Sequence, residues 1–209
     1  NRGLNVPLLV RWPGKIAAGT KSDALVSLVD ITPTFIDLAG GSPVEGLDGK
    51  SFKDIIKDNN NGNGGRKGCH DYIFAETSVE PHYWYNYTPA RSIITATGWH
   101  YIKNYHPGRR FITHIDKVEQ NEYYFDTWIS DAAHNPKTKF LLDRYSYRPP
   151  EELYNLNQDK EEFKNLAETA AIKDDPEAKN ILINLRALLQ KELARQGERT
   201  QMIMDGHLP

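Results

Sequence analysis

Between Asp58 and Gly68 the chain runs for eleven residues without one apolar side chain. Asn and Gly dominate this stretch, a composition typical of a flexible linker or loop. Such a stretch cannot join a hydrophobic core, and the apolar residues before and after it follow different patterns. The sequence therefore predicts two regions, with a boundary at residues 58–68.

The region before this boundary opens with a short apolar run at residues 6–12, which Pro13 and Gly14 close. A continuous apolar run bounded by a turn is typical of a strand that is covered on both faces. Parallel or mixed sheets of α/β proteins contain such strands. We therefore expect residues 6–12 to form one strand of a larger sheet.

Two helices are expected after that strand. Residues 30–39 carry apolar side chains at helical spacing, with Asp30 or Thr32 able to cap the first turn and Gly40 able to end the last. Residues 51–57 predict a second, shorter helix.

The region after the boundary has the pattern of an antiparallel sheet packed on a helix. Thr97 and Gly98 form a predicted turn between two of its strands. A stripe of leucines at helical spacing after Pro176 predicts a long amphipathic C-terminal helix through Gln196. A further helix is expected near residues 122–131. The four expected strands are residues 72–76, 90–95, 99–104 and 152–156.

Composition excludes several classes of function. Lys and Arg number 26 against 28 Asp and Glu, a formal charge of −2, so there is no basic excess with which to neutralise nucleic-acid phosphates. No apolar run approaches the ~18 residues that a membrane span needs. The single cysteine, Cys69, excludes an internal disulfide and a zinc site with several cysteines.

The chain carries no recognisable catalytic motif. Cys69 precedes His70 directly, but neighbours in a strand point to opposite faces, so we expect this cysteine to be structural. No two histidines have the i, i+4 spacing of a helical zinc site, and neither a phosphate-binding glycine loop nor a G-x-S-x-G motif occurs. We therefore assign no catalytic and no metal-binding residue.

Residues 76–91 are the strongest candidate for ligand contact. Aromatic rings in this segment offer apolar faces to sugar C–H groups, while its polar side chains can hydrogen-bond sulfate, carboxylate or hydroxyl groups. The alternative is that the aromatic residues only cover the edge of the sheet. The four candidate substrate-binding residues are Glu76, His82, Trp84 and Arg91.

In their order along the chain, these blocks resemble the C-terminal part of a type I sulfatase of the alkaline phosphatase superfamily. The stretch from Thr88 to Ser92 and the one from Arg148 to Tyr154 are more similar to heparan N-sulfatase (sulfamidase) and its bacterial relatives. Met204 to Gly206 also resembles that group. The resemblance covers residues 6–16, 23–40, 90–93, 99–104 and 152–167.

This resemblance implies an α/β fold, with an α+β C-terminal subdomain. Residues 1–57 would be the last strand and helix of the large mixed sheet of the catalytic domain. Residues 58–68 would be a linker. Residues 69–209 would form the smaller subdomain, an antiparallel sheet of about four strands packed on a C-terminal helix.

The resemblance also implies a reaction that this chain alone cannot perform. Type I sulfatases use a formylglycine residue, made within a C/S-x-P-x-R motif, and a Ca²⁺ ion held by Asp and Asn oxygens. No such motif occurs in this sequence. We therefore expect a C-terminal fragment, inactive alone, whose formylglycine and Ca²⁺ ligands lie upstream in its own N-terminal catalytic domain.

The implied substrate is a sulfated glycan, with heparan-type glucosamine favoured and either O-sulfate or N-sulfo groups as the target. The resemblance implies export to the periplasm or the extracellular space, or to the lysosome in a eukaryote, and is compatible with a homodimer. Two alternatives stay open. One is a phosphodiesterase or phosphonate hydrolase of the same superfamily, and the other is a non-catalytic carbohydrate-binding module.

Overall fold

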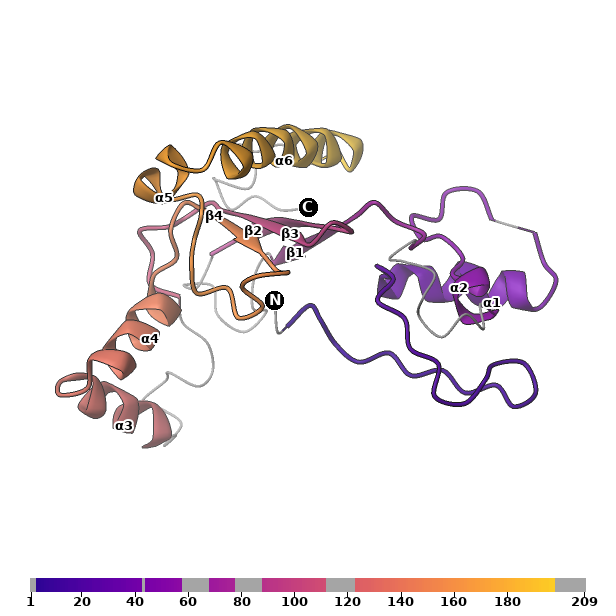
Figure 1. The fold of residues 1–209 in the computed structure, drawn as a ribbon, viewed down its shortest axis with the longest axis horizontal. Coiled ribbons are helices and arrows are strands. Elements are labelled where there is room, and N and C mark those ends of the chain that lie inside the picture. Colours follow the sequence, from indigo (N-terminus) through magenta and orange to yellow (C-terminus); the bar gives the residue numbers. More distant parts are fainter. Residues whose placement is uncertain (1–2, 43, 58–67, 78–87, 112–122, 198–209) are drawn as a thin grey trace. The chain divides into compact units, whose positions relative to one another are not determined.

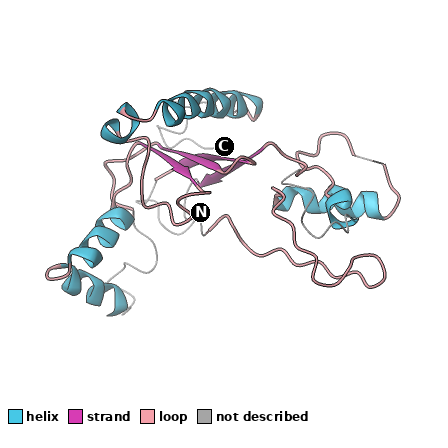
Figure 2. Ribbon diagram, in the orientation of Figure 1, coloured by secondary structure: helices cyan, strands magenta, loops and turns pink. Residues whose placement is uncertain are grey.

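The computed structural model of the chain describes residues 3–42, 44–57, 68–77, 88–111 and 123–197. Their regular elements are several helices and one sheet of four strands, ordered β1-β2-β3-β4 (Figures 1 and 2). This confirms a mixed fold with a small antiparallel sheet. The chain divides into two compact units, Asn1–Phe74 with Ile93–His100 and Tyr154–Lys164, and Ala75–Ser92 with Tyr101–Leu153 and Asn165–Pro209.

Each of the four strands lies within one residue of its predicted position. They are β1 (Tyr72–Thr77), β2 (Ala90–Thr95), β3 (Trp99–Asn104) and β4 (Glu151–Asn155). Register shows that neighbours run antiparallel, because residues late in one strand pair with residues early in the next. The backbone N–H groups of Ala96 and Leu156 donate to the carbonyls of Asp71 (2.8 Å) and Gly98 (2.7 Å). The three neighbouring pairs follow one another in chain order, as they do in a meander.

The predicted turn between β2 and β3 is present. The N–H of Gly98 donates to the carbonyl of Thr95 at 3.0 Å, and Gly98 has a φ of +90°, a conformation that glycine adopts without strain. The side chain of Asn157 closes the turn by donating to the carbonyl of Thr97 at 2.8 Å.

The C-terminal helix α6 (Pro176–Arg195) supplies the longest apolar stripe. Asp175 caps it by accepting from the N–H of Ala178 at 2.9 Å, and Pro176 occupies its first turn as expected. Its buried apolar residues repeat at helical spacing. They are Ala178, Leu182, Leu185, Leu189 and Leu193.

Strand β4 and helix α6 are joined by a polar contact at the edge of this core. The carboxylate of Glu151 accepts from the hydroxyl of Tyr101 at 2.6 Å and from Nε of Arg186 on α6 at 2.9 Å. Within the same unit as α6, Leu153 of β4 is completely buried, at 0 % exposure.

Two further helices, α3 (Tyr123–Ala132) and α4 (Pro136–Ser146), lie side by side as a hairpin (Figure 1). α3 agrees with the expected helix at residues 122–131. α4 was not expected, although Asn135 caps it and Pro136 begins it. Between β4 and α6 lies the short helix α5 (Thr169–Lys173).

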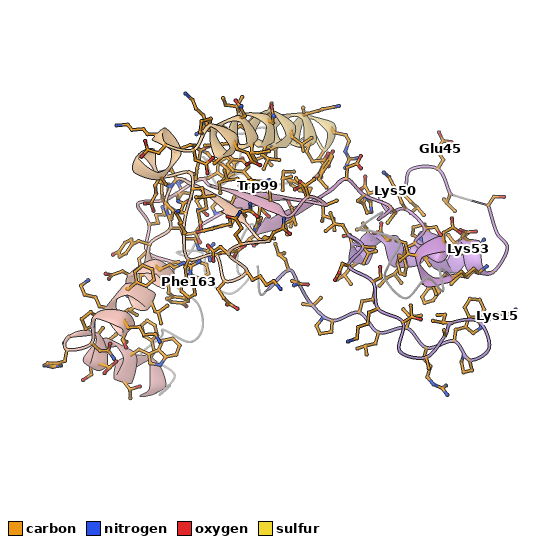
Figure 3. All side chains as sticks on the ribbon, in the orientation of Figure 1. Lys15, Glu45, Lys50, Lys53, Trp99 and Phe163 are labelled. Carbon is orange, nitrogen blue, oxygen red and sulfur yellow. The ribbon has the colours of Figure 1, made fainter. Side chains whose placement is uncertain are left out.

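The first region contains η1 (Leu28–Asp30), α1 (Ile31–Leu38) and α2 (Lys53–Lys57), so both helices expected there are confirmed. Polar contacts hold them together. Thr34 Oγ1 accepts from the N–H of Phe52 at 3.0 Å, and Lys53 Nζ, labelled in Figure 3, pairs with the carboxylate of Asp37 at 2.5 Å.

The strand expected at residues 6–12 is not formed. The structure assigns no regular element there, and apolar side chains of the segment are exposed, with Leu9 at 90 %. A strand needs the backbone groups of a neighbour, and within the described ranges the sheet consists of β1 to β4. The expected linker falls mostly on residues 58–67, outside the described residues, so the division at 57 and 69 stays a prediction. No described helix is both long enough and apolar enough to cross a membrane.

Candidate functional site

Arg91 and Glu76 connect the neighbouring strands β1 and β2 where residues 76–91 were expected to contact ligand. Arg91 on β2 is completely buried, and its Nη1 donates to the carbonyls of Thr77 and Ala90, both at 3.0 Å. Its Nε lies 3.3 Å from a carboxylate oxygen of Glu76, whose side chain is 51 % exposed. Arg91 therefore fixes the last residues of β1 and balances the charge of Glu76.

The geometry gives these two residues different chemical roles. A buried guanidinium that is already hydrogen-bonded to backbone carbonyls cannot reach a ligand in solvent without breaking those bonds. The half-exposed carboxylate of Glu76 can accept hydrogen bonds from sugar hydroxyls, although its charge would repel a sulfate group placed directly against it. His82 and Trp84, the other two candidates, lie outside the described residues.

A second polar cluster surrounds Asp30, at the start of α1. The carboxylate of Asp30 is completely buried and accepts from the backbone N–H of Ser27 (2.7 Å) and of Lys50 (2.8 Å). Nε2 of His70 lies 2.8 and 2.9 Å from its two oxygens. One side chain thus joins three segments that are far apart in the sequence.

Cys69 also belongs to this cluster, with its Sγ 3.8 Å from the carboxylate of Asp30 and 3.9 Å from the carbonyl of Leu25. Burial, and then the negative charge of Asp30, raise the pKa of Cys69 to about 11. The thiol therefore keeps its proton at neutral pH and is a poor nucleophile.

The ligand atoms of Asp30, Cys69 and His70 all lie within 4.8 Å of one another. A single carboxylate beside a thiol and an imidazole does not fit Ca²⁺, which takes six to eight oxygen ligands. Within the described ranges, these residues therefore offer no site for the calcium ion that the sulfatase resemblance implies. The sequence could not reveal the cluster, because Asp30 stands 40 positions before His70.

A third cluster, also missed from the sequence, combines guanidinium groups with aromatic rings beside α3 and α4. Arg148 lies over the ring of Phe111 at 3.8 Å, and Arg110 lies over Phe125 at 5.9 Å. Tyr145 contacts both rings, with centroids 5.5 and 6.0 Å apart. Burial lowers the pKa of Arg148. The pairing of these rings with arginines requires the folded chain.

Comparison with known protein families gives a match for the first 124 residues of the chain. They match the family described as N-sulphoglucosamine sulphohydrolase, C-terminal. This match covers more than half of the sequence and includes α1, α2 and strands β1 to β3. The chain belongs to this family.

Curated relatives of this sulphohydrolase C-terminal chain are sulfatases. An ulvan-active sulfatase of Formosa agariphila is 28 % identical over 217 residues, which is 99 % of this chain and 30 % of the relative. An N-acetylglucosamine-6-O-sulfatase of Bacteroides thetaiotaomicron is 34 % identical over 82 residues, which is 37 % of this chain and 15 % of the relative. The chain thus spans about 30 % of the length of the ulvan-active sulfatases that it matches.

Among solved structures, the chain is similar to that of BT4656 in complex with its substrate D-glucosamine-2-N,6-O-disulfate. The TM-score is 0.49 at 19 % identity, and the match covers 87 % of this chain and 28 % of the other.

Proposed function

We propose that this chain is the C-terminal region of a sulfatase that hydrolyses sulfate esters or N-sulfo groups of glycans, with heparan-type glucosamine as the favoured unit. The match of residues 1–124 to the sulphohydrolase C-terminal family carries the proposal. Alignment with an ulvan-active sulfatase along 99 % of the chain supports it.

In this proposal the reacting groups lie elsewhere in the enzyme. The sequence contains no C/S-x-P-x-R motif, and the cluster at Asp30 does not fit calcium. Formylglycine and Ca²⁺ would be supplied by the N-terminal catalytic domain, where the ion would stabilise the charge of the sulfate group. The contribution of this chain would be to select and orient the sugar.

Selection of the sugar is proposed to depend on residues 76–91. Glu76 would accept hydrogen bonds from sugar hydroxyls, while His82 and Trp84 would contact a charged substituent and the face of the ring. Arg91 would act as a positioning residue, because its hydrogen bonds to Thr77 and its pairing with Glu76 hold the end of β1. The proposal also includes export to the compartment where such glycans are found.

The test is sulfate release by the complete enzyme that contains this chain. Substrates would include N-sulfoglucosamine, N-acetylglucosamine 6-sulfate, ulvan oligosaccharides and a phosphate diester. Release of sulfate from a glucosamine derivative supports the proposal. Turnover of the phosphate diester alone would identify the phosphodiesterase alternative, and binding of glycans without any turnover would identify a carbohydrate-binding module.

Variants of the complete enzyme test the role of residues 76–91. We expect Glu76→Gln, His82→Ala and Trp84→Ala to raise KM for the preferred glycan by about tenfold each, with smaller changes in kcat, because binding contacts are lost. Glu45→Gln, at an exposed carboxylate in the loop before α2 (Figure 3), is the matched control. Unchanged kinetics across the substrate panel would refute the assignment of this segment.

A further inference from the structure

Asp30, Cys69 and His70 place three different ligand types around one point. Among the described residues, this is the group whose nitrogen, sulfur and oxygen atoms come within 4.8 Å of one another. Nε2 of His70 is 2.8 Å from Oδ1 of Asp30, and Sγ of Cys69 is 3.8 Å from Oδ2. The three atoms thus lie close together, one from the residue before α1 and two from the segment at residues 68–70.

These spacings approach those of a tetrahedral metal site. Typical zinc bonds of about 2.0 to 2.3 Å give about 3.3 to 3.6 Å between neighbouring ligand atoms. The sulfur to oxygen distance is within a few tenths of an ångström of that range. The imidazole is about half an ångström too close, a shift that rotation of a partly exposed side chain can supply, since His70 is 13 % exposed.

The backbone around Asp30 is arranged to hold its carboxylate in place. The N–H groups of Ser27 and Lys50 each donate to one of its oxygens, and such outer hydrogen bonds orient a metal ligand. Two glycines permit this close approach. A Cβ at Gly49 would lie 2.0 Å from the carbonyl oxygen of Val29, and one at Gly68 would lie 2.8 Å from the backbone of Leu25.

We propose that Asp30, Cys69 and His70 bind a transition-metal ion of the zinc class. A carboxylate, an imidazole and a thiolate together suit Zn²⁺ or Co²⁺, whereas Mg²⁺ and Ca²⁺ require oxygen ligands alone. The ion displaces the thiol proton of Cys69 to solvent. His70 binds through Nε2 as the neutral imidazole with its one proton on Nδ1, and any second ring proton is released to solvent. Water occupies the fourth position.

The bound ion would stabilise the first region of the chain. Its bonds to Cys69 and His70 and its bond to Asp30 join the segment after the stretch without apolar residues to the start of α1. A hydrogen bond between Asp30 and His70 achieves part of this without metal, but that pair has no need of a sulfur atom beside it. Binding of the metal by Cys69 is therefore the feature that distinguishes a metal site from a structural ion pair between Asp30 and His70.

Cobalt spectroscopy of the untagged 209-residue chain tests the proposal. Cys69 is the only cysteine in the chain, so a thiolate-to-cobalt charge-transfer band can arise from this site alone. We expect the band to saturate at one equivalent of Co²⁺ under reducing conditions and to disappear on addition of Zn²⁺.

Two variants and one control complete this test. Cys69→Ser should abolish the band, and His70→Ala should weaken Co²⁺ affinity at least tenfold, whereas His134→Ala, at an exposed histidine, should change neither. Circular dichroism establishes that each variant is folded. Absence of the band in the folded wild-type chain, or a band that His70→Ala leaves unchanged, would overturn the proposal. None of these readouts depends on sulfatase activity.

Discussion

At the scale of single residues, Gly98 combines a left-handed backbone conformation with a close neighbour. Its φ of +90° is unfavourable for any residue with a Cβ, and a Cβ would lie 2.6 Å from Nδ2 of Asn157. Gly98→Ala should therefore lower the free energy of unfolding by about 1–3 kcal/mol. Urea denaturation followed by circular dichroism measures this change.

Gly108→Ala is the matched control, because a Cβ there meets nothing within 4 Å and its φ is not in the left-handed region. Asn157→Ala in the Gly98→Ala background separates the two causes. This second substitution should restore the part of the unfolding free energy that the clash removes, and leave the loss that the backbone conformation causes. If Gly98→Ala and Gly108→Ala had equal effects, the proposed strain at the turn would be wrong.

Glu151 predicts a pH dependence of stability. Burial alone would raise the pKa of Glu151, but hydrogen bonds from Arg186 and Tyr101 outweigh it and hold the pKa below its usual value. A carboxyl group of this kind stabilises the fold above its unfolded pKa of about 4.3 and loses that contribution as the pH falls through the folded value. Tyr101 remains a donor throughout this range, since burial and then Glu151 raise its pKa.

Glu151→Gln should therefore cost about 1 kcal/mol at pH 7, a modest value because the side chain of Arg186 is half exposed. The difference from wild type should shrink as the pH falls from about 5 towards 3. Denaturation midpoints of wild type and variant at a series of pH values measure this difference in stability. Asp143→Asn, which removes an exposed ion pair with Lys139, should have little effect at any pH.

At the scale of elements, α6 depends on one buried stripe. Leu189 is 1 % exposed and Ile183 is 51 % exposed, although both are apolar residues of the same helix. Leu189→Ala should lower the free energy of unfolding by about 2–4 kcal/mol because it leaves a cavity, whereas Ile183→Ala should cost much less. Chemical denaturation of the two variants compares them directly, and equal losses would contradict the assignment of the stripe.

The elements that the sequence predicted well are those with strong local signals. β2 and β3 alternate in polarity on both sides of a glycine turn, and α6 combines a cap, a first-turn proline and an apolar stripe. α4 was missed because its side chains are mostly exposed and leave no apolar periodicity. Its signal was instead the cap, with Oδ1 of Asn135 accepting from the N–H groups of Lys137 and Thr138.

The candidate site was predicted only in part, because the sequence reveals local patterns but not contacts between distant segments. Glu76 and Arg91 were proposed together from one segment, and the structure brings them together at 3.3 Å. The burial of Arg91 could not be read from the sequence, because it depends on packing of the complete sheet. The cluster of Asp30 with His70 joins segments 40 residues apart, and no local pattern encodes that contact.

At the scale of the whole molecule, residues 4–10 are rich in apolar side chains, yet these side chains lie in solvent. Leu4, Val6, Leu8 and Val10 are all between 45 and 54 % exposed, and Leu9 is 90 % exposed. Exposed apolar surface of this extent marks a site of contact with other protein. A segment outside the sheet can also pair with a strand of another chain.

We therefore expect the isolated 209-residue chain to self-associate. Its apparent mass in size-exclusion chromatography with light scattering should exceed 23.8 kDa and rise with concentration. The triple variant Leu8→Ser, Leu9→Ser, Val10→Ser should shift the chain towards the monomer, because it removes the apolar surface without altering a described core residue. Ala17→Ser with Ala18→Ser, also at exposed positions, is the control and should leave association unchanged. A wild-type chain that stays monomeric at all concentrations would show that residues 4–10 need no partner.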